Sequence, residues 1–116
     1  MLIRSISGVR GLVKTDLLPK TCAAYAAGVH AMPPDGVIMI GRDSRPSGEQ
    51  LSDAMVEILL NYGRDVISLG IVPTPRVQFM VERTDAVAGV VITASHNPIE
   101  WNGLKFIRGD GTFFPI

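Results

Sequence analysis

Three short apolar runs, separated by two segments with helix signals, leave few folds open to this chain. The runs are residues 37–40, 65–69 and 89–93, and their length and β-branched side chains are typical of buried strands. The first intervening segment repeats apolar residues at helical spacing, and the second opens with a threonine-proline pair. The order strand, helix, strand, helix, strand predicts a largely parallel sheet with right-handed crossovers.

The two crossover helices carry signals at their ends. Ser47 followed by Gln50 has the pattern of a capping box, so we expect Ser47 to be the N-cap of a helix that Gly63 ends. At the second helix we expect Thr74 to be the cap and Pro75 the first helical residue. The apolar face of the first helix would consist of Leu51, Met55, Ile58, Leu59 and Tyr62.

Further elements are expected on both sides of this pattern. Residues 19–31 are alanine-rich and predict a helix, whose buried face would consist of Cys22, Tyr25, Ala26 and Val29. Residues 104–107 and 112–114 flank a turn-rich segment and predict a hairpin. No repeat or linker divides the sequence, so residues 1–116 are expected to form one domain.

Composition and charge exclude several classes of function. Lysine plus arginine number 11 and aspartate plus glutamate number 11, so the net charge is zero and no long-range field favours nucleic acid or an anionic membrane surface. No apolar stretch reaches the roughly 18 residues that span a bilayer, and no secretory signal pattern is present. Cys22 is the only cysteine and is compatible with a reducing compartment, so we expect a cytoplasmic protein.

The segment that follows the third apolar run, residues 93–98, concentrates reactive side chains. It places Ser95, His96 and Asn97 in a loop that a proline keeps from becoming helix, and such loops at the carboxyl ends of strands bind ligands in α/β proteins. Lys105 follows at the start of the next expected strand, so serine and lysine are expected near one site. The alternative is a turn in which Ser95 and Asn97 bond only to their own backbone.

Two arginine-containing segments are further candidates. Residues 41–45 follow a predicted strand and carry Arg42 and Arg45, which suit phosphate or carboxylate, although a solvated loop with an Arg–Asp pair is the alternative. Residues 7–11 place Arg10 between two glycines, a pattern that lets backbone approach a ligand but also occurs in ordinary turns.

Several common motifs are absent. Residues 36–41 have the glycine spacing of a phosphate-binding P-loop but lack the lysine and hydroxyl residue that must follow. No dinucleotide fingerprint and no nucleophile elbow occur. A serine hydrolase would need His30 as its base, and we expect His30 to be a cation at the end of a helix instead.

Residues 93–98, followed by Trp101-Asn102-Gly103-Leu104-Lys105, resemble the active-site segment of the α-D-phosphohexomutases, the phosphoglucomutase/phosphomannomutase superfamily. Residues 7–11 and 41–45 strengthen the resemblance, because they occur in the order found in that family. The resemblance spans almost the whole chain. It implies the N-terminal domain I of such an enzyme, a three-layer α/β/α fold with a mixed, mostly parallel sheet.

The resemblance also implies roles for individual residues. Ser95 would be the phosphoserine, which donates its phosphoryl group to a phosphosugar and recovers one from a bisphosphorylated intermediate, and its phosphate would bind Mg²⁺. Lys105 would transfer a proton, and His96 and Arg10 would assist. A sugar 1,6-bisphosphate would be the activator. The residues expected to contact substrate or phosphate are Arg10, Arg42, Arg45, Asn97 and Asn102.

By the same resemblance the chain is expected to be a truncated fragment of a four-domain enzyme, inactive alone. The other domains would supply the remaining Mg²⁺ ligands and the specificity for the sugar, so the expected partners are a phosphosugar and the missing domains. Ser5-Ile6 and Trp101 are similar to a phosphoglucosamine mutase subgroup, whereas Thr93 is commoner in phosphoglucomutases and phosphomannomutases, so the hexose stays open. The alternative function is a non-catalytic phosphosugar-binding or regulatory domain.

Overall fold

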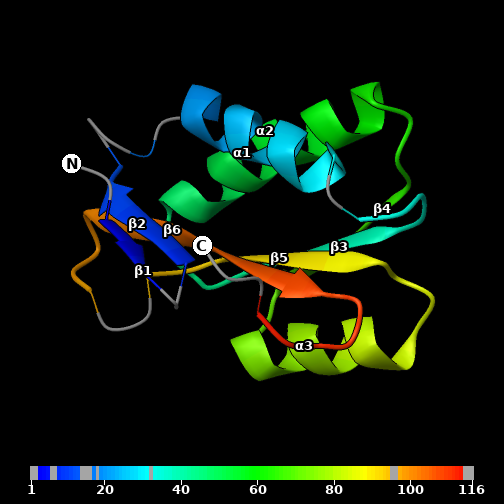
Figure 1. The fold of residues 1–116 in the computed structure, drawn as a ribbon. Helices are drawn as coiled ribbons and strands as arrows, with labels where there is room; N and C mark the ends of the chain where they lie inside the picture. Colours follow the sequence, from blue (N-terminus) through cyan, green and yellow to red (C-terminus); the bar gives the residue numbers. More distant parts are fainter. Residues whose placement is uncertain are drawn as a thin grey trace.

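A computed structural model describes residues 3–5, 8–13, 17, 19–31, 33–94 and 97–113. They form one six-stranded sheet, in the order β1-β2-β6-β5-β3-β4, with helices on both faces (Figure 1). The strands are β1 (Ile3–Ser5), β2 (Gly8–Leu12), β3 (Ile38–Arg42), β4 (Val66–Ile71), β5 (Ala88–Ile92) and β6 (Trp101–Arg108), and the helices are α1 (Pro19–Ala31), α2 (Ser47–Asn61) and α3 (Thr74–Arg83).

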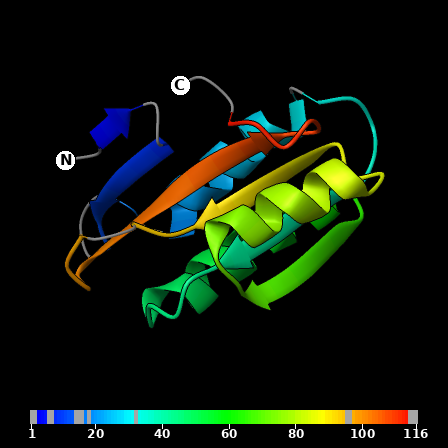
Figure 2. The ribbon, with the colours of Figure 1, turned by 90° about the horizontal axis from the view of Figure 1, so that it is seen from below.

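The helices divide into two layers. Helices α1 and α2 pack together over one face of the sheet, and α3 covers the other (Figures 1 and 2). The larger core lies under α1 and α2, and its fully buried members include Val9, Cys22, Ile40, Met55, Leu59, Val90 and Leu104. The smaller core under α3 consists of Met39, Val77, Val81, Ala86, Val91 and Ile107. The predicted three-layer α/β/α fold is therefore confirmed.

The sheet is mixed, as expected, although only two of its five strand pairs are parallel. Strand β3 pairs in parallel with β4 and with β5, which are the crossover connections that the alternating pattern predicts. Strand β6 runs antiparallel to both β5 and β2, and β1 runs antiparallel to β2. Four strands therefore share one direction, and the two that oppose them, β1 and β6, lie outside the crossover units.

Apolar periodicity predicts the helices correctly, but not their caps. Helix α1 has the predicted bounds, and α2 ends at Asn61, with Tyr62 as its C-cap and Gly63, at φ +83°, directly after it as predicted. The predicted capping box is wrong: Pro46 is the N-cap of α2 and no side chain caps this end. The hydroxyl of Ser47 instead accepts a hydrogen bond from Nδ2 of Asn102 on β6, 2.9 Å away. At α3 the cap is Pro73, and Thr74 is already helical.

The predicted role of His30 is also wrong. Nδ1 of His30 accepts a hydrogen bond from Nε of Arg64, at 3.0 Å, so the cation at the end of α1 is Arg64 and not His30. Arg64 is only 5% exposed and donates to four carbonyl oxygens of the chain that leaves α1, those of His30, Pro33, Pro34 and Gly36. This residue ties α1 to the strands that follow it.

The predicted hairpin is reduced to a turn and a single bridge. Strand β6 begins at Trp101, before the expected residue 104, and after it the described chain pairs only Ile107 with Phe113. The turn itself forms, because Gly111 N donates to the carbonyl oxygen of Arg108 at 2.9 Å.

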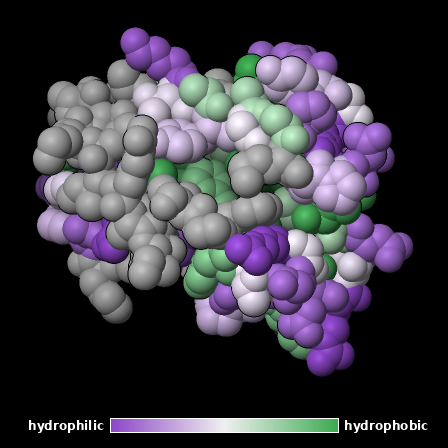
Figure 3. All heavy atoms as spheres, in the orientation of Figure 1, coloured by the Kyte–Doolittle hydropathy of each residue, from purple (hydrophilic) through white to green (hydrophobic). Residues whose placement is uncertain are grey.

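Hydrophilic side chains dominate the outer face of α3, at the lower right of the space-filling view (Figure 3). Arg76, Glu82 and Arg83 are exposed there. None of the helices in the described part of the chain is long and apolar enough to cross a membrane.

Candidate functional site

The candidate site lies where strands β3 and β5 end. The two strands are parallel, and Arg42 pairs with Ile92, so the residues that follow them emerge side by side at one edge of the sheet. The backbone N–H of Asp43 donates to the carbonyl oxygen of Ile92 at 3.1 Å. The loop from residue 93 to residue 100, which contains the predicted nucleophile, therefore leaves the sheet directly beside residues 43–45.

Ser95 and His96 lie outside the described residues, so their predicted roles stay predictions. The residues on either side of them are placed. Thr93 and Ala94 are buried, and the N–H of Asn97 donates to the carbonyl oxygen of Ala94 at 3.0 Å. The position of the loop at the edge of the sheet is thus defined by its flanks.

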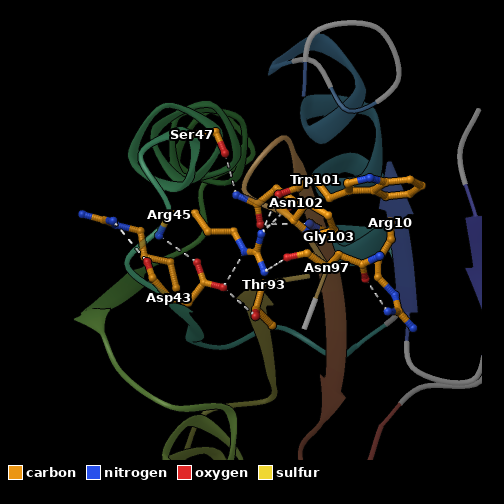
Figure 4. Close-up of polar contacts among 11 residues, drawn as sticks. Arg10, Asp43, Arg45, Ser47, Thr93, Asn97, Trp101, Asn102 and Gly103 are labelled. Atoms are coloured by element: carbon orange, nitrogen blue, oxygen red, sulfur yellow. Dashed lines mark hydrogen bonds and ion pairs between the residues drawn. The ribbon is translucent and has the colours of Figure 1, made fainter. Parts of the chain in front are cut away.

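Asp43 joins the start of this loop to Arg45 (Figure 4). Oδ2 of Asp43 accepts a hydrogen bond from the hydroxyl of Thr93 at 2.7 Å and from Nε of Arg45 at 3.1 Å. Oδ1 accepts from the backbone N–H of Arg45 at 3.0 Å. Both carboxylate oxygens are therefore used within the protein.

Arg45 contacts the far side of the same loop. Its Nη2 donates to the carbonyl oxygen of Asn97 at 2.8 Å. Its Nη1 donates to the carbonyl oxygens of Pro98, at 2.6 Å, and of Trp101, at 3.2 Å. The side chain is only 11% exposed. The Arg–Asp pair of the alternative therefore forms between Asp43 and Arg45, but the guanidinium of Arg45 is bound to backbone carbonyls and is not solvated.

Arg10 reaches the loop from strand β2. Its Nη1 donates to Oδ1 of Asn97 at 2.7 Å, so two of the predicted site residues meet (Figure 4). Nε of Arg10 is buried and has no hydrogen-bond partner within the described structure. Buried donors are nearly always paired in folded proteins. This unpaired N–H is therefore a group that an acceptor bound at the site would satisfy.

Lys105 shares a face of the sheet with Arg10. Strand β2 pairs Arg10 with Gly103, and Lys105 is two residues further along β6, so both cations project from the side opposite α1 and α2. The pKa of Lys105 is below its usual value, mainly because the amine is partly buried and secondly because of the positive charge of Arg10. Nζ of Lys105 lies 5.8 Å from the ring centroid of Phe113.

The remaining predicted residues are placed less directly at the site. Asn102 is fully buried, and its amide is used by the protein: Nδ2 donates to Ser47, and Oδ1 accepts from the N–H of Gly103 at 2.9 Å. Arg42 is partly exposed, and its Nη1 makes a long contact of 3.4 Å with the carbonyl oxygen of Asp43.

Sequence reasoning assigned no role to Gly103 and gave Asp43 only the part of a partner in an Arg–Asp pair, although the structure gives both a part in the site. A Cβ on Gly103 would lie 2.7 Å from the carbonyl oxygens of both Thr93 and Val9, so only glycine fits where β6 passes between the two neighbouring strands. Asp43 lies two residues before Arg45, and that spacing was the one available signal of their contact.

A cavity of about 450 Å³ opens beside the loop, and its lining residues are Asp43, Ser44, Arg45, Asn97 and Ile99. A second cavity, of about 420 Å³, lies beside His30 and Arg64, near the residues that precede β3 and β4. Because β3 and β4 are parallel, this second cavity is at the opposite edge of the sheet from Asp43. His30 is therefore not placed to serve the loop that contains Ser95.

The described residues contain no group of three or more histidine, cysteine, aspartate or glutamate side chains able to hold a metal ion.

Comparison with known proteins gives consistent matches. The family described as "Phosphoglucomutase/phosphomannomutase, alpha/beta/alpha domain I" matches residues 2–116. A phosphoglucosamine mutase from Limosilactobacillus fermentum is 43% identical over 110 residues, which cover 90% of this chain and 24% of that protein. One from Pelotomaculum thermopropionicum is 42% identical over 108 residues, again with 90% and 24% coverage.

A crystal structure assigned as a phosphomannomutase from Thermus thermophilus superposes with a TM-score of 0.78 at 30% identity, covering 99% of this chain and 27% of that one. The chain thus spans about a quarter of the length of the relatives it matches. The chain belongs to the phosphoglucomutase/phosphomannomutase family, and its described residues have the α/β/α fold of that family's domain I.

Proposed function

We propose that this chain is the phosphoserine-bearing domain of a phosphohexomutase, which interconverts hexose 1-phosphate and hexose 6-phosphate. The observation that carries the proposal is that Arg10 and Lys105 share one sheet face beside the loop in which Ser95 lies, with Arg10 bonded to Asn97 of that loop. Family membership over residues 2–116 supports the same assignment.

The proposed reaction has two phosphoryl transfers. In the first, a sugar hydroxyl oxygen bonds to the phosphorus on Ser95, the bond from phosphorus to Oγ breaks with its electron pair on Oγ, and the hydroxyl proton passes to Lys105. In the second, Oγ attacks the other phosphate of the bisphosphorylated sugar, and the sugar oxygen that leaves takes the proton back from Lys105. A lowered pKa suits this lysine to both directions of transfer.

Arg10 contributes charge to these steps. Its Nη1 is occupied by Asn97, and its buried Nε–H has no acceptor in the described structure, so an oxygen of the phosphoryl group would satisfy it. The same guanidinium lowers the pKa of Lys105. Arg10 would therefore bind the phosphoryl group and add to the effect of burial, the larger cause, in lowering the pKa of Lys105.

Mg²⁺ would polarise the transferring phosphoryl group and stabilise its charge. Asp43, the carboxylate that bonds to Thr93 of the loop, has both oxygens engaged, so this chain would offer the metal mainly the phosphate on Ser95. These residues fit a site that is completed by other domains of the same polypeptide. A sugar 1,6-bisphosphate would prime Ser95, and the working location would be the cytoplasm.

The identity of the hexose is part of the proposal. The similar proteins from Limosilactobacillus fermentum and Pelotomaculum thermopropionicum are named phosphoglucosamine mutases, which favours glucosamine phosphate over glucose or mannose phosphate. Comparing the kcat/KM of the complete polypeptide for the three sugar phosphates tests this. A preference for glucose or mannose phosphate would contradict the assignment of the sugar while leaving the reaction class intact.

The reaction class is tested by the phosphorylation of Ser95. We expect the complete polypeptide to gain one phosphoryl group at Ser95 from a sugar 1,6-bisphosphate, measured by intact-protein and peptide mass spectrometry, and Ser95→Ala to lose both this label and turnover. The control is Ser68→Ala, since Ser68 is an exposed residue of the edge strand β4.

Three results would overturn the proposal. Near-normal turnover by Ser95→Ala would exclude Ser95 as the nucleophile, and the absence of phosphate on Ser95 would favour a non-catalytic phosphosugar-binding or regulatory domain. Labelling of Ser95 by a fluorophosphonate probe would favour a serine hydrolase, which we do not expect because His30 lies at the other edge of the sheet.

The 116-residue chain alone is expected to be inactive, and its turnover of a hexose 1-phosphate would contradict that.

A further inference from the structure

We propose that Arg45, together with Asp43 and Thr93, is a positioning unit that sets the conformation of the loop containing Ser95, and that Arg45 is not a ligand of the substrate phosphate. This inference rests on the proposed function, because the loop matters for turnover only if Ser95 carries the phosphoryl group. It replaces the role that the sequence suggests for Arg45.

The guanidinium of Arg45 is already occupied by partners within the protein. Phosphate recognition by arginine depends on two parallel N–H donors along one edge of the group. In Arg45, Nε bonds to Asp43, Nη2 to the carbonyl of Asn97, and Nη1 to the carbonyls of Pro98 and Trp101. No edge keeps two donors for a phosphate, and the side chain is 11% exposed.

The groups that Arg45 and Asp43 bind lie on both sides of Ser95 in the chain. The described residues of the loop, 93–94 and 97–100, are not in a helix or strand, so their polar backbone groups need partners from elsewhere in the protein. The carbonyls of Asn97 and Pro98 follow Ser95 in the chain and are bound by Arg45, whereas Thr93 precedes Ser95 and is bound by Asp43. The carboxylate of Asp43 joins the two halves through Nε of Arg45.

The segment that carries Asp43 and Arg45 is itself held in place. Asp43 and Arg45 lie in the short connection from β3 to α2, which is anchored at both ends. The N–H of Asp43 bonds to Ile92 at 3.1 Å, and the N–H of Gly48, in the first turn of α2, bonds to the carbonyl oxygen of Arg45 at 3.0 Å. A short, anchored connection thus holds both sides of the loop, which is the arrangement that positions a reacting group.

Arg45→Lys separates positioning from phosphate binding, because lysine keeps the charge but cannot reach one carboxylate and three carbonyls from a single nitrogen. In the complete polypeptide we expect kcat to fall about 10- to 100-fold, with KM for the phosphosugar within about twofold of the parent value. A phosphate ligand would behave in the opposite way, with a raised KM and a preserved kcat, and that result would overturn the proposal. Arg76→Lys is the matched control, because Arg76 is an exposed residue of α3.

Thr93 supplies a milder variant that preserves side-chain volume. Thr93→Val removes only the hydroxyl that binds Asp43, and Thr93→Ser restores it. We expect Thr93→Val to lower kcat and Thr93→Ser to recover most of the loss. Equal losses in the two variants would show that packing, and not the hydrogen bond to Asp43, is what matters at this position, and would remove Thr93 from the unit.

Amide hydrogen exchange gives a readout that does not depend on activity. In Arg45→Lys and Thr93→Val we expect faster exchange at the amides of Asn97 and Trp101, which bond within the loop, and unchanged exchange in helix α3. Unchanged exchange at Asn97 and Trp101 would overturn the positioning role. If Ser95 takes up no phosphate in the parent protein, the proposed function fails, while the exchange result still decides whether Arg45 orders the loop.

Discussion

Arg10 and Arg45 lie beside the same loop, yet the structure uses their guanidinium groups differently. Arg45 has its donors bound to Asp43 and to loop carbonyls, whereas Arg10 binds Asn97 with Nη1 and keeps a buried Nε–H without an acceptor in the described structure. The sequence presents both as arginines in turn-like segments. Their functions differ because their hydrogen-bond partners differ, and residue type alone does not decide those partners.

Lys105 is the residue whose replacement should affect chemistry most directly. Lys105→Met in the complete polypeptide is expected to lower kcat by the roughly 10²–10⁴ typical of lost acid–base catalysis, measured by steady-state turnover. An effect confined to KM would instead mean that Lys105 only binds substrate.

The pH dependence of turnover tests the coupling between Lys105 and Arg10. Arg10 lowers the pKa of Lys105, so Arg10→Gln should raise it. The neutral amine is the form that accepts a proton, so the rate rises with pH through this pKa, and the rising limb of kcat should move to higher pH in the variant. A limb that stays in place in Arg10→Gln would contradict the contribution of the Arg10 charge to the pKa of Lys105.

Gly103 limits how closely β2, β6 and the end of β5 can approach. Gly103→Ala would place a methyl group 2.7 Å from two backbone oxygens, and we expect it to destabilise the protein by about 1–3 kcal/mol in urea unfolding. Gly28→Ala is the control, because a Cβ at that helical position meets nothing within 4 Å apart from its chain neighbours and the backbone of its own helix. It should stabilise by about 0.5–1 kcal/mol, so equal effects of the two substitutions would contradict the argument.

At the scale of elements, the attachment of α1 depends on a residue outside that helix. Arg64 follows α2 and bonds to Nδ1 and the carbonyl oxygen of His30, while the ring of His30 stacks on Tyr62 at a centroid distance of 4.4 Å. One buried cation thus fixes the end of α1 against the end of α2. The periodicity of either helix carries no information on this contact.

Replacing Arg64 should therefore loosen α1. Arg64→Met removes the donors to several carbonyls through partly buried bonds, and we expect a loss of about 2–4 kcal/mol in the free energy of unfolding. Arg76→Met, at an exposed position of α3, should change stability by less than about 0.5 kcal/mol. A small effect at Arg64, similar to that at Arg76, would mean that packing alone holds α1 in place.

At the scale of the whole molecule, Cys22 reports whether the α1–α2 layer is closed over the sheet. Its thiol is fully buried in the larger core, and burial raises its pKa to about 12. The lower thiolate fraction alone should slow alkylation by iodoacetamide at pH 8 by about 10³-fold relative to the unfolded chain, measured by peptide mass mapping. Rapid alkylation under native conditions would show that α1 separates readily from the sheet.

The sequence determined the helices, the three strands of the crossover units, the layered fold class and the family. Each of these depends on local periodicity or on short motifs, as at residues 19–31 and 93–98, so neighbours along the chain are sufficient. Only the tertiary structure decided that β6 lies between β2 and β5, that Ser47 bonds to Asn102 instead of capping α2, and that Arg45 binds loop carbonyls. Asn102 is 55 residues from Ser47, and Asn97 is 52 from Arg45. Contacts at such separations arise when the sheet assembles, because the polar groups that become buried must then find whichever partners the fold has brought near.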